Sequence, residues 1–357
     1  MRESDGGNMF ERIKNTRNSI GHPALLSCAV ALGAICIHAL VPSTALAQTN
    51  FSGAGSAGAQ FLKIGVGARY LAMGEASVAL GGDAFSLYWN PAALTEIEGD
   101  QLALAHNNWV LDISLNYAAY AHRIEGFGVL AVGVTALSVP DDEVTTVTQQ
   151  DGNGLFFNAN SYAVTLGFAR ELTPRFAFGG SFKYINESIF TENASGVGFD
   201  LGTMLQTGLR NLRLGMNITN LGSELRFDGP NLRVQVPSGN SINDAQLTVE
   251  SFGLPLIFRV GVAYDVQLAP QQRLTLASEL KHPNDNIQQG GVGLEYGYNE
   301  RFFLRSGYKI NYDEEDLTLG AGLQTPFGKE SNLTIDYAWV DLGRLNSTHR
   351  FSFNVSF

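Results

Sequence analysis

The chain carries little charge and, beyond its first 47 residues, no cysteine. Lys, Arg, Asp and Glu make up 16% of its 357 residues, against roughly 25% in an average soluble protein. The two cysteines are Cys28 and Cys36, so the remainder has neither a disulfide framework nor a thiolate metal site. The formal net charge is −11. Because no basic stripe is present to neutralise phosphates, nucleic acid is not expected as a partner.

The sequence also lacks the residue clusters that enzymes use. It contains no HExxH motif and no pair of histidines at metal-binding spacing, and its predicted mature part has no Gly-x-Ser-x-Gly elbow. We therefore expect no catalytic residue, no metal and no cofactor. The acidic run 313–316 is interpreted as a solvated loop tip. A barrel enzyme such as a lipid hydrolase stays an alternative, because its Ser and His need not be close in sequence.

Residues 1–47 have the pattern of a cleaved secretory signal peptide. Lys14 and Arg17 precede an apolar stretch, and Ala45-Leu46-Ala47 form a small-x-small cleavage site. Met1 and Met9 both fit as the start. A retained membrane anchor is the alternative. No later segment has about 18 consecutive apolar residues, which excludes a transmembrane helix. An exported chain that enters a membrane must then do so as a closed barrel.

Residues 100–357 have the period of β-strands and predict an all-β fold, a transmembrane antiparallel barrel. Leu256, Phe258 and Val260, for example, alternate with Arg259 and Gly261, as expected for strands with one lipid face and one inner face. A soluble two-sheet sandwich alternates similarly, but aromatic residues near the strand ends favour the barrel. The fourteen predicted strands are 101–107, 113–123, 126–137, 159–170, 175–186, 196–206, 211–219, 256–266, 272–281, 288–298, 302–310, 317–324, 332–340 and 349–357.

Three further features follow from this strand pattern. Arg259 and Asp265 fall on the inner face of their strand and are candidates to face the lumen. The long loops 140–157 and 222–255 are expected on the extracellular side. Phe357 ends an alternating final strand and resembles the signal that the barrel assembly machinery recognises.

Residues 48–59 form a flexible leader, and residues 60–99 form a small helical or irregular plug rich in Gly and Ala. Asn90, Pro91 and Ala92 make a corner at the junction of plug and barrel, because a proline pushes the preceding residue out of the helical region. Trp89 precedes this corner. Arg69 and Asp83 are the plug charges expected to meet partners on the barrel wall, since an unpaired charge in a dry lumen is costly.

The plug sequence resembles the N-terminal signature of the PorV/PorQ family of outer-membrane proteins. The matching elements are Phe61-Leu62-Lys63-Ile64, Ala68-Arg69, Met73-Gly74-Glu75-Ala76 and Tyr88-Trp89-Asn90-Pro91-Ala92. The Asn-Pro-Ala element also resembles the FadL-like group of fourteen-stranded transporters. The resemblance implies a barrel in the outer membrane of a Gram-negative bacterium.

Two functions are compatible with this resemblance. The first is support of protein export or surface attachment, as a shuttle or assembly component of a type IX secretion system, with cargo proteins or secretion components as partners. The second is a FadL-like channel for hydrophobic small molecules, with such a molecule as its ligand. In both cases outer-membrane lipid and the barrel assembly machinery are the expected surroundings.

Overall fold

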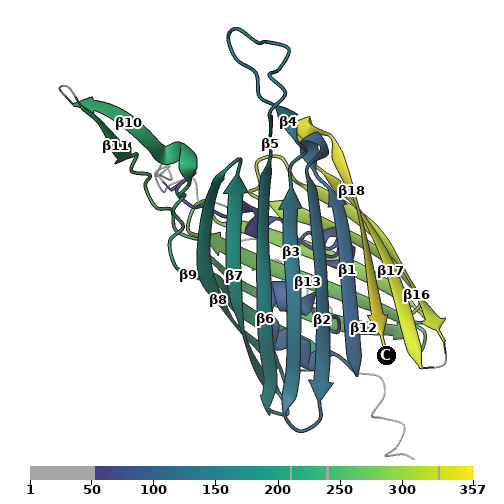
Figure 1. Cartoon of the computed structure of the whole chain (residues 1–357). Coiled ribbons are helices and arrows are strands. Elements are labelled where there is room, and N and C mark those ends of the chain that lie inside the picture. Colours follow the sequence, from purple (N-terminus) through teal and green to yellow (C-terminus); the bar gives the residue numbers. More distant parts are fainter. Residues whose placement is uncertain (1–52, 210, 239–240, 329) are drawn as a thin grey trace, which may run out of the picture. The chain divides into compact units, whose positions relative to one another are not determined.

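The computed structural model describes residues 53–209, 211–238, 241–328 and 330–357. The predicted signal peptide, residues 1–47, and the first residues of the leader lie outside these ranges and stay predictions. Fourteen strands form a closed antiparallel barrel in which each strand pairs with two neighbours, and β1 pairs with β18 to close the ring (Figure 1). None of the helices among the described residues is long and apolar enough to cross a membrane.

All fourteen predicted strands are present, and this confirms the all-β barrel. Side chains alternate along them between a buried inner face and an outer face; in the strand of residues 331–341, for instance, Asp336, Ala338 and Val340 are buried. The barrel strands are β1 (Asp100–Asn108), β2 (Ser114–Ile124), β3 (Gly128–Ser138), β6 (Ala159–Thr173), β7 (Phe176–Ile189), β8 (Glu192–Gln206), β9 (Leu212–Gly222), β12 (Ile257–Ala269), β13 (Gln272–Pro283), β14 (Gln289–Tyr298), β15 (Phe302–Ile310), β16 (Leu317–Phe327), β17 (Ser331–Asp341) and β18 (Ser347–Ser356).

The two ends of the barrel differ in the length of their connections. One end, the short-turn end, has tight turns such as 174–175 and 270–271, and the chain enters β1 and leaves β18 there. At this end Asp100 and Phe357 exchange backbone hydrogen bonds of 2.9 Å. The other end, the long-loop end, carries the connections 139–158 and 223–256.

Both long connections contain a hairpin that the strand period did not reveal. β4 (Asp142–Glu143) pairs with β5 (Phe156–Phe157), and β10 (Arg233–Ser238) pairs with β11 (Ser241–Gln246). Figure 1 shows β10 and β11 standing beyond the rim of the barrel, paired with each other alone. These strands bury no face against the barrel. At β10 the apolar residues Leu232, Val234 and Val236 alternate with Arg233 and Gln235, but this run is only five residues long and Pro230 and Pro237 flank it.

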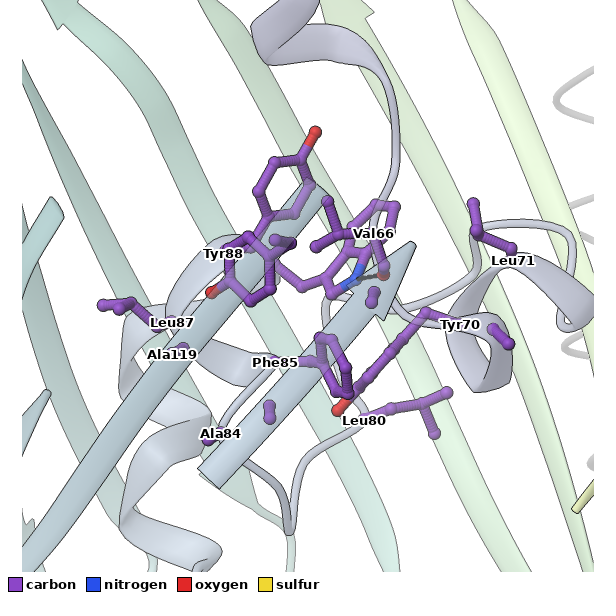
Figure 2. Packing of buried hydrophobic residues seen from close by; sticks show 14 of the residues in the cluster. Val66, Tyr70, Leu71, Leu80, Ala84, Phe85, Leu87, Tyr88 and Ala119 are labelled. Atoms are coloured by element: carbon purple, nitrogen blue, oxygen red, sulfur yellow. Dashed lines mark hydrogen bonds between the residues drawn. The ribbon is translucent and has the colours of Figure 1, made fainter. Parts of the chain in front are cut away.

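The plug, residues 60–99, lies inside the barrel as short helical turns joined by irregular segments. These are η1 (Gln60–Lys63), α3 (Ala68–Ala72), α4 (Ser86–Trp89) and η2 (Pro91–Glu96). Figure 2 shows Tyr70 and Phe85 packed side by side within the wall, with Val66 and Tyr88 beside them. These side chains are at most 8% exposed, so the plug forms the hydrophobic core that the barrel wall encloses.

Candidate functional site: the plug and its contacts with the barrel

The corner at Asn90 joins three separate segments of the chain. The fully buried Asn90 side chain donates from Nδ2 to the carbonyl of Val78 at 2.7 Å and to that of Thr203, in β8, at 3.1 Å. Its Oδ1 accepts a hydrogen bond from the Ala92 backbone N–H at 3.1 Å, which caps η2. The amide thus connects the plug to itself and to the wall.

Trp89, directly before this corner, lies in a group of buried aromatic side chains. Its indole Nε1 donates to the carbonyl of Val66 at 2.9 Å. The ring stacks on Tyr70 with centroids 5.8 Å apart and meets Tyr88 edge-on at 5.0 Å. The Arg259 guanidinium lies 5.7 Å from the ring centroid. Trp89 therefore contacts both the plug interior and the wall.

Glycines on the inner face of the wall make room for the plug backbone. A Cβ atom at Gly202 would lie 2.1 Å from Asn90 Oδ1, and one at Gly179 would lie 2.5 Å from the backbone N of Ala92. A Cβ at Gly215 would lie 2.1 Å from the carbonyl oxygen of Val78. We call the full set the glycine seat: Gly133, Gly167, Gly179, Gly202, Gly215, Gly261, Gly291, Gly293, Gly307 and Gly320, each of which faces a plug atom closely.

Arg69 contacts the wall, whereas Asp83 binds groups of the plug. Arg69 Nε lies 3.1 Å from Glu295 Oε2, in β14, and its Nη1 lies 3.5 Å from Asp83 Oδ2. Asp83 Oδ1 accepts hydrogen bonds from the Tyr70 hydroxyl at 2.7 Å and from the Phe85 backbone N–H at 3.0 Å. The two predicted plug charges therefore meet each other, and Arg69 extends the contact to the wall.

Glu295 is the centre of a buried ion-pair network. Besides Arg69, it binds Arg305 at 2.7 Å and Arg273 at 3.1 Å, and Arg305 also binds Asp336 at 2.6 Å. Glu295 and Arg305 are at most 4% exposed. These residues come from four strands, β13, β14, β15 and β17. Because they lie on different strands, no local sequence pattern predicts that they meet.

A second set of contacts holds the middle of the plug. Glu279, in β13, accepts hydrogen bonds from the backbone N–H groups of Ser77 at 2.8 Å and Val78 at 2.7 Å, and it pairs with Arg259 at 3.4 Å. Arg259 is 2% exposed and faces the lumen. Asp265 lies toward the short-turn end of the same strand and pairs with Arg213 at 3.0 Å.

The start of the plug is held at the long-loop end. Lys63 Nζ lies 2.8 Å from Asp285 Oδ2 in the β13–β14 loop, and Gln60 Nε2 donates to the same oxygen at 2.8 Å. Burial opposes ionisation of Asp285, but the hydrogen bonds from Lys63 and Gln60 outweigh it and lower the pKa of this carboxyl below its usual value.

Phe357 follows β18 at the short-turn end, and its side chain lies on the outer surface of the barrel. It is 54% exposed, and its ring stacks on Tyr120 with centroids 6.5 Å apart. An exposed ring at the strand terminus is accessible to a partner, and its role as an assembly signal stays a prediction.

Cavities adjoin the plug at both ends of the barrel, and a groove lies on the outer face of the wall. A cavity of about 210 Å³ lies at the long-loop end beside Lys63, and one of about 660 Å³ lies at the short-turn end beside Glu96 and Arg213. An apolar groove of about 390 Å³ lies on the outer wall over β3, β6, β7 and β8. Behind this groove Leu87 of the plug fills the space that a Cβ at Gly167 would occupy, at 2.4 Å.

Over residues 48–283 the chain matches the family described as Type IX secretion system protein PorV. It belongs to the PorV family. A search of curated proteins finds no match. PorV-family membership and the barrel fold together place this protein in the outer membrane. Long loops are typical of the extracellular side of such barrels, so we expect the long-loop end there.

Solved structures show the same fold. The CymD monoaromatic hydrocarbon channel aligns with a TM-score of 0.57 and 15% identity, covering 82% of this chain and 98% of that one. The toluene transporters TodX of Pseudomonas putida and TbuX of Ralstonia pickettii, also 15% identical, give TM-scores of 0.56 and 0.52; each alignment covers 82% of this chain and 97% of the transporter. The FadL-like barrel group expected from the sequence is therefore confirmed as the fold. The matched family and these neighbours are secretion and transport proteins rather than enzymes.

Proposed function

We propose that this PorV-family barrel supports the export or surface attachment of secreted proteins, and that it acts through its extracellular elements while the plug stays in place. The observation that carries the proposal is the match to the type IX secretion family over residues 48–283. Cargo proteins or other secretion components are the partners that this function requires.

The contacts between the plug and the barrel wall favour a lumen that the plug fills at all times. Leaving one member of a buried ion pair without its partner costs about 3–5 kcal/mol. Withdrawing the plug would remove Arg69 from Glu295 and Glu75 from Lys309, which it meets at 2.7 Å. It would also uncover the aromatic group around Trp89. The sum is comparable to the roughly 5–15 kcal/mol stability of a whole domain, so spontaneous exit of the plug is expected to be rare.

The extracellular hairpin β10–β11 supports docking of a partner at the cell surface. Its backbone edges pair with no other strand of the described chain, and Val236 and Ile242 are 45% and 69% exposed. An isolated two-stranded hairpin is marginally stable in water, and unpaired edges favour addition of a partner strand.

Quantitative proteomics of the medium and cell surface of a strain lacking the gene tests the proposal. Loss of a set of proteins that share a C-terminal domain, restored by the wild-type gene, is the expected result. An unchanged set of secreted and surface proteins would overturn the export role.

A second function is favoured by the apolar groove on the outer wall and by the likeness of the fold to the hydrocarbon channels. This function is uptake of a hydrophobic small molecule. Leu87 separates the groove from the lumen by filling the space over Gly133 and Gly167. Toluene uptake measured in the same deletion strain distinguishes the two functions: reduced uptake with unchanged secretion would favour the channel.

A further inference from the structure

The 210 Å³ cavity at the extracellular end is lined by both plug and wall. Gln60, Lys63 and Glu75 come from the plug. Lys281, Tyr312 and Arg350 come from β13, the β15–β16 loop and β18, and Trp109 comes from the β1–β2 connection. Neither function proposed above uses this cavity.

Arg350 lines the cavity, and its charged group has few partners among the described residues. The residue is 1% exposed. Its Nε donates to Thr348 Oγ1 at 3.2 Å, and its guanidinium lies 4.8 Å from the centroid of the Trp109 ring. Nη2 is buried without a hydrogen-bond partner among the described residues. A guanidinium carries five N–H donors, so most of its hydrogen-bonding capacity is unused.

The carboxylates near the cavity are already bound to lysines. Asp285 binds Lys63 at 2.8 Å, and Glu75 binds Lys309 at 2.7 Å and Lys281 at 3.8 Å. Glu315 also binds Lys309. Four cations, counting Arg350, thus surround three carboxylates. Among the described residues no carboxylate lies within 4 Å of Arg350, so the cavity has one positive charge in excess.

We propose that this cavity binds a small monoanionic carboxylate with a flat apolar body. The carboxylate binds the Arg350 guanidinium, which lines the cavity and has no carboxylate within 4 Å among the described residues, because a charge-assisted hydrogen bond to a guanidinium is strong. The apolar body lies against the aromatic rings of Trp109 and Tyr312, which line the same space. A volume of about 210 Å³ is below the roughly 300–1,000 Å³ of pockets for drug-sized ligands, so the ligand is small.

Isothermal titration calorimetry on the refolded mature protein tests the proposal, with benzoate as the carboxylate and benzamide as its uncharged counterpart. Benzoate is expected to bind the wild type, and benzamide at least about tenfold more weakly. Arg350→Gln removes the charge and should weaken benzoate binding by about tenfold or more, since a charge-assisted hydrogen bond contributes about 1.5–3 kcal/mol. Arg344→Gln is the matched control, because Arg344 is an extracellular arginine whose side chain is 88% exposed and bound to Glu314.

A second variant covers the case in which Arg350→Gln fails to fold, as judged by heat-dependent mobility in gel electrophoresis. Trp109 lies outside the barrel strands, so the barrel of Trp109→Ala is expected to fold. This variant should bind benzoate several-fold more weakly than the wild type. Absence of benzoate binding to the wild type, equal binding of benzoate and benzamide, or unchanged binding in the variant that folds would each overturn the proposal. Sulfate binding as tight as that of benzoate would overturn the assignment of a flat apolar ligand.

Discussion

Replacement of Asn90 by alanine is expected to destabilise the plug more than any other single amide substitution in it. The substitution removes three hydrogen bonds of this side chain: the two to Val78 and Ala92 are buried, and the one to Thr203 is partly buried. A buried hydrogen bond contributes about 1 kcal/mol net, and a buried carbonyl left without a donor costs about 1–3 kcal/mol. Together these terms predict a loss of about 3–5 kcal/mol in the free energy of unfolding.

Urea titration of the refolded protein in detergent measures this loss through tryptophan fluorescence, because Trp89 neighbours Asn90 in the plug. Asn90→Asp is the informative control. It keeps the acceptor for the Ala92 N–H but turns a carboxylate oxygen toward the carbonyls of Val78 and Thr203, so its loss should equal or exceed that of alanine. A stability of Asn90→Ala within about 1 kcal/mol of the wild type would refute the assigned role of the corner.

Three further substitutions test other parts of the plug contacts. Gly215→Ala should lower the free energy of unfolding by about 1–3 kcal/mol through overpacking. Gly180→Ala is its control and should be near neutral, because its Cβ would meet its nearest atom at 3.5 Å. Equal effects of the two substitutions in urea titration would contradict the glycine seat. Glu295→Gln should cost about 3–5 kcal/mol and the exposed partner Glu300→Gln at most about 1 kcal/mol, and a reversed order would contradict the buried network. Asp285→Asn should remove a pH-dependent part of the thermal stability.

The sign of this last effect follows from the lowered pKa of Asp285. A carboxyl with a lowered pKa in the folded state stabilises the fold fully above its unfolded pKa, about 3.9, and loses this contribution as the pH falls through the folded value. The melting temperature of the wild type should therefore exceed that of Asp285→Asn at pH 7, and the difference should shrink below about pH 4. A difference that grows on acidification would contradict the assignment.

The barrel itself could be predicted from the sequence because its signal is local. Alternation such as that of Leu317, Leu319 and Leu323 with Thr318 and Gly320 reports directly which face of a strand meets lipid. The strand positions and the even count followed from this period alone.

The contacts of the plug could be predicted only in part. Arg69 and Asp83 were identifiable as charges in an apolar segment, but Glu295 and Glu279 are more than 190 residues away from the plug groups that they bind, so no local pattern marks them. For the glycine seat, the alternation of the strands places residues such as Gly215 and Gly307 on the inner face of the barrel. That the plug contacts these glycines is known only from the position of the plug backbone in the structure.

The hairpin β10–β11 was missed for a different reason. Val234 and Val236 of β10 alternate with Arg233 and Gln235, but the run is short, and the flanking Pro230 and Pro237 argue against a strand.

The proposed function is support of secretion from the extracellular side of the barrel with the plug in place. Its most direct test is the set of secreted and surface proteins in a strain whose single copy of the gene lacks residues 233–246, with a strain carrying Gly180→Ala as control. The expected result is a normally folded barrel in the outer membrane and loss of the same secreted proteins as in the full deletion. An unchanged set of secreted proteins in the presence of that folded barrel would contradict it.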